Sequence, residues 1–345
     1  MPQFVTATVT QILGERPGLQ RIDTDAGRAY ALADVIGPVS VGDQVVLNTT
    51  AVSLGLGTGG WHVVHWNLAR REWSQPGAGH VMKLRYTSVQ LDTGAAEEVH
   101  QNLPERLDGV PVVVCLLHSQ VATVAATARW TRPDARIAYV MTDGAALPLA
   151  VSELVSQMCD RGILNTTITA GQAFGGNFEA VSVPSGLVLA RHAAQADLLV
   201  VGMGPGIVGT SSALGTTAVE AAAILDSAAA LGGRAGLCVR ASEADGRIRH
   251  RGVSHHVSTV LRLVRTPPEV PVPPRLETEI PTGTAVKPPD VAMLLDEMGL
   301  RVTSMGRGPG DDPLFFEAAG AAGVWGAQAV PDDPTRAPPH PHAGI

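Results

Sequence analysis

Two patterns along the 345 residues predict a mixed α/β fold: a mostly parallel, doubly wound, Rossmann-like sheet with a small N-terminal β-barrel-like domain. The first part of the chain has short, alternating apolar segments separated by turn residues, which is typical of a curled sheet. From about residue 111, short β-branched runs alternate with alanine-rich segments, which is typical of parallel βαβ units. A hydrophobic content of 45% is enough for a substantial core.

The barrel-like domain is expected over residues 1–67. Glycine, proline and Asp-Ala-Gly separate its segments, and Gly42-Asp43 is expected as a turn before a Val-Val-Leu strand. The strand candidates are VTATVTQI, RAYALADV, VGDQVVLNTT and GGWHVVHW.

The α/β domain is expected over residues 68–266. Its strand candidates are VPVVVCLL, ARIAYVM, LNTTITA, ADLLVVGM and RAGLCVR. The helices between them are expected over residues 121–129, 149–159, 183–194 and 217–231. This alternation predicts a parallel sheet covered by helices on both faces.

The C-terminal part of the chain divides into three segments. Residues 267–290 are rich in proline and predict an extended linker or surface strap. Residues 291–330 have the pattern of a further βα unit that joins the α/β domain. Residues 331–345 have the composition of a disordered tail.

Charge and composition exclude several classes of partner. The net charge is −7 and no block of Lys or Arg stands out, so neither nucleic acid nor a membrane is an expected partner. The three cysteines form no Cys-x-x-Cys pair, and no secretory or membrane-spanning segment is present, which together predict reduced, buried thiols in a cytoplasmic protein. The expected partners are a small-molecule ligand and a second copy of the chain, since the alanine-rich helices suit close packing in a homodimer. The sequence identifies no cofactor.

Polar residues follow the predicted strands, where the loops of a parallel sheet bind ligands. His118 and Ser119 follow the first strand, Asp143 the second, Asn177 the third and Gly204 the fourth. We therefore expect these strand ends to meet in one cleft and to bind a substrate, with Asp143 as a catalytic carboxylate. Turns are also polar for conformational reasons alone, and the Asp143-Gly144 pair is typical of such a turn.

The run VVGMGPGIVGTSSALGTT contains the pattern G-x-G-x-x-G after a strand. Seven residues intervene before the next helix, and Thr210 stands where a phosphate-binding loop needs lysine, so neither a dinucleotide nor a nucleoside triphosphate is expected. Thr217 and Glu220 have the spacing of a capping box, which would engage both side chains with their own helix. The loop predicts either a small anionic ligand near Gly204, Gly206, Thr210 and Ser211 or a purely conformational turn.

The stretch HRGVSHH holds three histidines in seven residues. Ser254 is a good N-cap for the following helix, which places His255 and His256 in the first turn, where the helix dipole disfavours their protonation. Either ring is then a candidate general base, with His250 and Arg251 as substrate-binding residues. No usual zinc motif is present, so a metal site would need distant ligands such as His118, Asp143 or Glu179. The alternative is a polar helix entry that happens to carry imidazoles.

Together these motifs resemble an uncharacterised bacterial family, domain of unknown function 3866. The resembling stretches are GHVMKLRYTSVQ, YVMTDGAALPLA, GQAFGGNFEAV, VVGMGPGIVGTSSALG, RHRGVSHH and TSMGRGPGDDPLFF. They span residues 79–316 and leave the proline-rich tail outside. The resemblance implies family membership and supplies no catalytic residue.

Three functions remain open on the sequence alone. The leading hypothesis is an enzyme that acts on a small polar or anionic metabolite at the carboxyl ends of the parallel strands. The second is a metal-assisted hydrolase, and the third is a non-catalytic metabolite sensor or oligomeric scaffold.

Overall fold

The computed structural model describes residues 1–77 and 79–332 and divides them into two compact units. Residues 1–95 group with 148–153, and residues 96–147 group with the rest of the chain. Most of the tail expected to be disordered, from residue 333 onward, lies outside the described residues. Within the described ranges, no helix is both long and apolar enough to cross a membrane.

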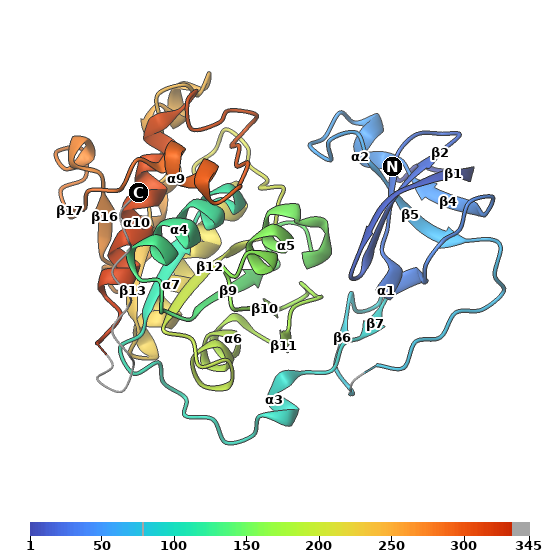
Figure 1. The fold of residues 1–345 in the computed structure, drawn as a ribbon, viewed down its shortest axis with the longest axis horizontal. Helices are drawn as coiled ribbons and strands as arrows, with labels where there is room; N and C mark the ends of the chain where they lie inside the picture. Colours follow the sequence, from blue (N-terminus) through green and yellow to red (C-terminus); the bar gives the residue numbers. More distant parts are fainter. Residues whose placement is uncertain (78, 333–345) are drawn as a thin grey trace. The chain divides into compact units, whose positions relative to one another are not determined.

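The first unit contains the predicted barrel, which is closed and has the strand order β1-β2-β3-β5-β4 (Figure 1). Alternate residues point inward, and Val9, Ile22, Val45 and Leu47 form its core. The sequence pattern did not identify β2, and part of the expected strand RAYALADV is the helical turn α1. The elements are β1 (Phe4–Arg16), β2 (Leu19–Thr24), β3 (Ala29–Ala31), α1 (Ala33–Ile36), β4 (Gln44–Asn48), α2 (Thr50–Ser53) and β5 (His62–Asn67).

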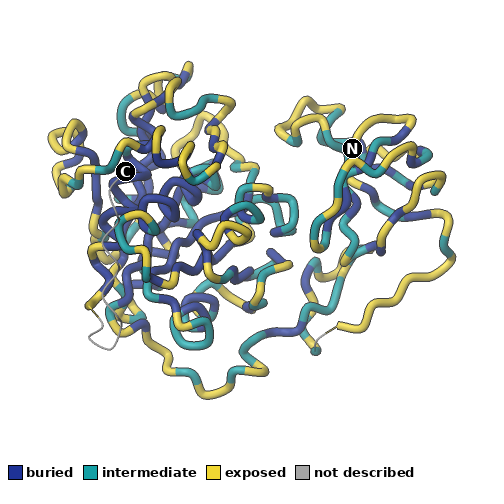
Figure 2. The backbone as a smooth tube through the Cα atoms, viewed as in Figure 1, coloured by how far each residue is buried: buried dark blue, intermediate teal, exposed yellow. Residues whose placement is uncertain are grey.

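The predicted parallel sheet forms the centre of the second unit. All five of its strand pairings are parallel, and the strand order is β11-β10-β9-β12-β8-β13. The strands are β8 (Pro111–Cys115), β9 (Ile137–Thr142), β10 (Thr166–Ala170), β11 (Phe178–Ala180), β12 (Leu198–Met203) and β13 (Arg234–Cys238). Every residue of β8, β9 and β12 is buried, as near-continuous apolar runs predict for strands covered on both faces (Figure 2).

Helices cover both faces of this sheet. The contacts place α4, α9 and α10 together on one face and α6, α7 and α8 together on the other. The helices are α4 (His118–Thr131), α5 (Glu153–Asp160), α6 (Val183–Val188), α7 (Glu220–Ala230), α8 (His255–Leu263), α9 (Val291–Glu297) and α10 (Pro313–Gln328). A π-turn, η2 (Leu189–Ala193), continues α6, and a 3₁₀ turn, η3 (Thr217–Val219), precedes α7. The sequence therefore predicted these helices and five of the six strands in the correct order, whereas β11 lies in a segment that was expected to be a loop.

Two short pairings and several single turns complete the chain. In the first unit these are β6 (Met82–Lys83), β7 (Leu91–Asp92) and η1 (Leu149–Val151), and α3 (Ala96–Val99) opens the second unit. After β13 come β14 (Ala241–Ser242), η4 (Ile248–His250), β15 (Gly252–Val253), β16 (Val270–Val272), η5 (Pro274–Leu276) and β17 (Gly283–Ala285).

The C-terminal part of the chain differs in one respect from its predicted pattern. The proline-rich segment lies along the edge of the sheet, where Glu269 N donates to Ala235 O and Leu237 N donates to Glu269 O at 2.9 Å each. Residues 291–330 contain α9 and α10 but no strand of the sheet, because the expected strand around Val302 is an irregular connection. The apolar pattern there reflects burial of Leu300 and Val302 beneath the helices rather than strand pairing.

The cysteines are free thiols, as expected. Cys115 and Cys238 are buried on neighbouring strands, whereas Cys159 is exposed, contrary to the expectation that all three are buried. Cys159 lies on the amphipathic helix α5, whose buried side is formed by Val155 and Met158.

The close packing of α10 against α4 depends on glycine. Gly323 of α10 lies where an added Cβ would overlap the Thr127 hydroxyl and the Val124 carbonyl of α4. Since Val124 O belongs to the helix backbone, the two helices must move apart to accept a methyl group.

We expect Gly323→Ala to destabilise the protein by about 1–3 kcal/mol in urea unfolding, because overpacking outweighs the gain in helix propensity. Gly310→Ala is the matched control, since a Cβ there meets nothing within 4 Å. An unchanged or increased stability of Gly323→Ala would show that the two helices are not in close contact.

Candidate functional site

The parallel topology gathers the carboxyl ends of six strands at one edge of the sheet. From β8 and β9 the chain moves toward the β11 side, whereas from β12 it moves across β8 toward β13. The direction of winding therefore reverses beside β12. In open α/β sheets, ligands bind at the carboxyl edge at such a reversal.

Hydrogen bonds join the strand ends around β12. His118 Nδ1 lies 3.2 Å from the carbonyl oxygen of Met203, which links the ends of β8 and β12. Ala146 N donates to Pro205 O at 3.0 Å, which links the loop that carries Asp143 to the glycine loop. Three of the four strand ends expected to meet, those of His118, Asp143 and Gly204, are thus neighbours.

Asp143 follows β9 and is exposed. Its Oδ2 atom accepts a hydrogen bond from Gln172 N at 2.9 Å, so the carboxylate connects the ends of β9 and β10. This contact is compatible with the turn that the Asp-Gly pair predicted, and it leaves the Oδ1 atom without a hydrogen bond among the described contacts.

Glu220 is a candidate functional residue that the sequence interpretation missed. The predicted capping box is wrong: Thr216 is the N-cap of η3, and Glu220 Oε1 instead accepts a hydrogen bond from Thr142 Oγ1 at 2.6 Å. The Glu220 carboxyl group therefore crosses from the start of α7 to the end of β9, and an added Cβ on Gly144 would overlap it. A strand that ends in Thr-Asp-Gly beside a helix that begins with glutamate is the only sequence signal of this contact.

The environment of Glu220 favours its protonated form. The pKa of the carboxyl group is raised to about 7: burial is the main cause, the Thr142 hydrogen bond lowers the pKa, and the negative charge of Asp143 adds to the rise. Two carboxyl groups in unequal environments at one site are the arrangement that separates an acid from a base in many enzymes.

His118 begins α4 on the other side of β12. Burial lowers its pKa to about 4, so the ring is neutral at physiological pH. Because the Met203 carbonyl oxygen only accepts hydrogen bonds, the proton is assigned to Nδ1, and Nε2 is then an acceptor. Ser119 is the next residue of α4 and is half-buried.

Asn177 does not lie at this edge. It precedes β11 and is level with Thr167, near the amino end of β10, where its Oδ1 atom accepts a hydrogen bond from Thr167 N at 2.9 Å. The loop after β10 carries the chain back along the sheet, so Asn177 stabilises the strand entry. Nearby Glu179 is also engaged, since its Oε2 atom accepts from Thr169 Oγ1 at 2.7 Å.

The glycine loop after β12 folds on itself. Gly209 pairs with Thr216, and Thr210 N donates to Gly215 O at 2.7 Å. The Thr210 hydroxyl lies 3.0 Å from Ser212 Oγ, whereas Ser211 is exposed. This hairpin separates β12 from α7, as expected from the seven residues between the glycine pattern and the helix.

Within the loop, the two glycines nearest to β12 differ in environment. Gly204 is buried against the Ala146 carbonyl, where a side chain has no room, and Gly206 is exposed with a φ of +100°. The close approach at Gly204 joins the two loops, and the conformation of Gly206 allows the turn that follows.

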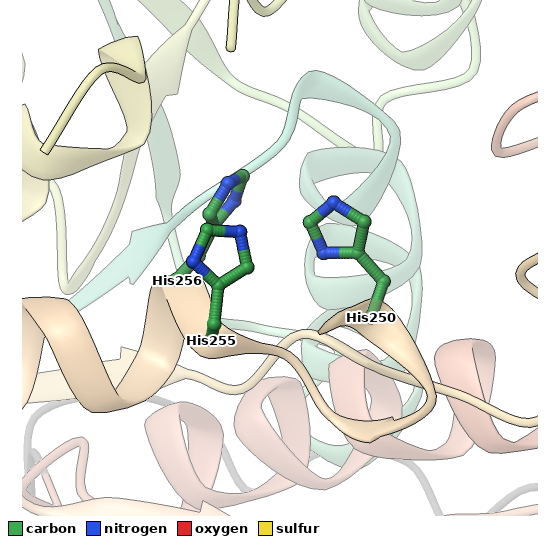
Figure 3. A group of neighbouring side chains, drawn as sticks. All are labelled: His250, His255 and His256. Carbon is green, nitrogen blue, oxygen red and sulfur yellow. The ribbon is translucent and has the colours of Figure 1, made fainter. Parts of the chain in front are cut away.

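The three histidines of HRGVSHH form one cluster after β13 (Figure 3). His250 lies in η4, and His255 and His256 are the first two residues of α8. The three ring centroids lie 4.5–5.0 Å from one another. Ser254 is the N-cap, as predicted: its Oγ atom accepts from His256 N at 3.3 Å and lies 2.8 Å from His250 Nδ1.

Burial and nearby arginines keep these imidazoles neutral. Burial and the charge of Arg240 lower the pKa of His250 to about 4 and that of His256 to about 3. The pKa of His255 is lowered by burial and by the charges of Arg249 and Arg240. Arg240 Nη1 lies 3.2 Å from His256 Nδ1.

Buried ion pairs hold the segment that carries the cluster. Asp245 accepts hydrogen bonds from Arg247 Nε at 2.9 Å and Nη2 at 2.8 Å, and these bonds hold its pKa well below the usual range. Arg251, expected to bind substrate, instead donates from Nε to Asp245 O at 2.9 Å. Asp312 accepts from Ser242 Oγ at 2.6 Å and from Arg307 Nε at 3.2 Å. The sequence interpretation missed this network because its members come from separate segments.

A cavity of about 560 Å³ lies at the opposite, amino edge of the sheet. Its arginines are engaged in structural hydrogen bonds: Arg136 Nη1 donates to Gln195 Oε1 at 2.7 Å, and Arg191 Nη1 donates to Ala196 O at 3.2 Å. The carboxyl edge has the perturbed carboxyl and imidazole groups, so it remains the better candidate site. The lining residues of the cavity are Asp108, Val110, Arg136, Arg191, His192, Gln195, Asp197, Val330, Pro331 and Asp332.

Comparison with known proteins gives one match. The model of a family described as "Protein of unknown function (DUF3866)" matches residues 28–323, which confirms the resemblance. No curated protein and no solved structure matches the chain significantly.

The perturbed carboxyl group makes a prediction about stability. The folded-state pKa of Glu220 is raised from 4.5 to about 7, so the folded protein holds a proton that the unfolded chain has lost between these values. Stability from this group is present at low pH and is lost as the pH rises through 7. We compare the free energy of unfolding of Glu220→Gln with that of wild type at pH 5 and at pH 8. We expect the difference to shift in favour of Glu220→Gln by about 1–2 kcal/mol from pH 5 to pH 8, after allowance for solvent screening.

Urea unfolding of both proteins at the two pH values measures this difference. Glu98→Gln, at an exposed position of α3, is the matched control and is expected to show no such change. A difference between Glu220→Gln and wild type that does not depend on pH would mean that Glu220 ionises normally.

Proposed function

This chain belongs to the family described as Protein of unknown function (DUF3866), and we propose that it is an enzyme that moves protons on a small polar or anionic metabolite. The proposed site is the carboxyl edge of the sheet beside β12. The observation that carries the proposal is the Glu220 carboxyl group, which is held by Thr142 at the reversal of the sheet and has a pKa of about 7.

Acid–base catalysis is most efficient when the pKa of the catalytic group lies near the working pH. Glu220 meets this condition, so it is proposed as the group that donates and accepts the proton. Asp143 lies close enough for its charge to act on Glu220, and it is proposed to orient a hydroxyl or amine of the substrate through Oδ1.

Substrate binding is proposed to use neutral groups around the two carboxyls. His118 at the start of α4 has a neutral ring, Ser119 next to it presents a hydroxyl, and the backbone at Gly206 is exposed and unhindered by a side chain. The N-terminus of α4 also favours a negative charge, which suits an anionic metabolite.

The hypothesis that His255 or His256 is the general base is less well supported. His256 Nδ1 is engaged by a guanidinium, and its pKa of about 3 makes it a weak base at neutral pH. The homodimer and the cytoplasmic location remain predictions from the sequence.

The test begins with thermal shift of the full chain against inorganic phosphate, pyrophosphate, malonate, succinate and the common amino acids. Each stabilising compound is then incubated with the protein in D₂O and followed by ¹H NMR for deuterium uptake or conversion. We expect Glu220→Gln to slow the exchange or conversion by about 10²–10⁴-fold, as for loss of a general acid–base group. Asp143→Asn is expected to weaken binding, and Glu98→Gln to change neither.

Two results would contradict the proposal. A stabilising compound recovered without deuterium or conversion makes the protein a binding protein rather than an enzyme. Equal turnover by wild type and Glu220→Gln places the chemistry elsewhere.

A further inference from the structure

The histidine cluster after β13 is separate from the carboxyl groups beside β12 and has its own chemistry. One nitrogen from each of His250, His255 and His256 lies within 4.8 Å of the other two. His250 and His256 are only 2% and 4% exposed. Nitrogens bound to one tetrahedral ion are about 3.3 Å apart for a bond of about 2.0–2.1 Å, so the ring nitrogens must approach one another by up to about 1.5 Å to reach a common centre.

The local backbone explains why the rings converge. Ser254 ends a short extended segment and caps α8, which places His255 and His256 on its first turn (Figure 3). Gly252, with a φ of +61°, allows the turn that returns His250 to the same side. The three rings come from two turns that are fixed to each other through Ser254.

One of the three rings has a buried atom without a partner, and a second ring is fixed by a hydrogen bond. His255 Nε2 is buried and has no hydrogen-bond partner in the described part of the chain. A buried polar atom without a partner destabilises the folded state, so such atoms usually have a ligand or a water. His250 Nδ1 lies 2.8 Å from the Ser254 hydroxyl oxygen, which fixes the orientation of this ring beside the other two. Ring orientation by a hydrogen bond at the second nitrogen is typical of metal-binding histidines.

We propose that His250, His255 and His256 bind a divalent transition metal ion of the zinc class through their three imidazoles. Imidazole is a preferred ligand for zinc and its neighbours. Three protein ligands with a fourth position for water or substrate are typical of catalytic rather than structural zinc sites. This proposal goes beyond the proposed function, and its test does not need the metabolite.

The charges around the cluster indicate what occupies the fourth position. The nearby carboxylates form ion pairs, Asp245 with Arg247 and Asp312 with Arg307, so neither is proposed as a metal ligand. Arg240 is buried beside His256 and adds positive charge. A dication in this setting favours an anion, so the fourth ligand is hydroxide or an anionic group of a small molecule.

Arg240 also competes with the metal. A guanidinium only donates hydrogen bonds, so His256 Nδ1 accepts and the proton of the neutral ring lies on Nε2. When a neutral ring binds a metal through Nε2, its proton lies on Nδ1, and Nδ1 can then no longer accept a hydrogen bond from Arg240. Metal binding through Nε2 therefore requires that the Arg240 contact is broken. Arg240 has an alternative partner in Asp245 Oδ2, which lies 3.5 Å from its Nη2 atom.

The experiment uses the full chain, stripped with a chelator and then titrated with Zn²⁺ by calorimetry and with Co²⁺ by visible absorption, which reports the coordination of the ion. We expect one equivalent to bind and the Co²⁺ spectrum to show a four-coordinate site. His255→Ala is expected to weaken binding by about 100-fold or more, because it removes a direct ligand.

Two controls distinguish this site from other imidazoles. His192→Ala removes a histidine outside the cluster, and the double variant His340→Ala/His342→Ala removes those of the tail; both are expected to bind as wild type does. Arg240→Leu removes the competing donor and is expected to tighten binding by about 10-fold, a gain that misfolding cannot produce.

Two outcomes would overturn the proposal. One is less than stoichiometric binding of both ions to the stripped wild-type chain. The other is an affinity that His255→Ala leaves unchanged. Either outcome leaves the role of Glu220 intact, since that residue is tested without metal.

Discussion

The pairing of β12 with β9 on one side and β8 on the other is the contact on which the candidate site depends. Because the pairings are parallel, the three strands end at the same edge, and their loops must share that space. The chain leaves β12 in the opposite direction to β8 and β9, and Glu220 at the start of α7 contacts Thr142 at the end of β9. Burial of the whole apolar length of these strands fixes the arrangement, since a shift in register would move every side chain to the other face.

Two groups of polar residues lie at the ends of these strands, one beside β12 and one after β13, and they are stabilised differently. Beside β12, Glu220 is half-buried with one hydroxyl partner, so its charged form is penalised and the group is poised near neutral pH. After β13, the pairs of Asp245 with Arg247 and of Asp312 with Arg307 fix a long segment that has little regular structure of its own. Such buried pairs add little net stability but make alternative conformations of the segment costly. The side chain of Gln120 links the two regions, since it accepts from Leu116 N and donates to Val239 O, each at 2.9 Å.

The sequence predicted the sheet and its helices well but the candidate site only in part. Burial in the core selects apolar residues along a whole segment, and this composition can be read from the segment alone. The strands β8, β9 and β12 and the alanine-rich helices were predictable for this reason. Ser254 was also predictable, because capping is a local interaction. Glu220 was misassigned because its spacing from Thr217 matched a local rule, whereas its partner Thr142 lies 78 residues away. Asn177 was misplaced because the glycine-rich loop after β10 returns the chain toward the amino edge, and a loop composition does not specify direction.

We propose that the carboxyl edge beside β12 binds the ligand. Hydrogen–deuterium exchange mass spectrometry of the full chain tests it most directly, with and without whichever probe among phosphate, pyrophosphate, malonate, succinate and the amino acids stabilises the protein most. We expect protection to concentrate in residues 142–146 and 203–220, which carry the Asp143 loop, the glycine loop and Glu220. Protection confined to residues 106–110 and 191–197, which border the cavity at the amino edge, would contradict it.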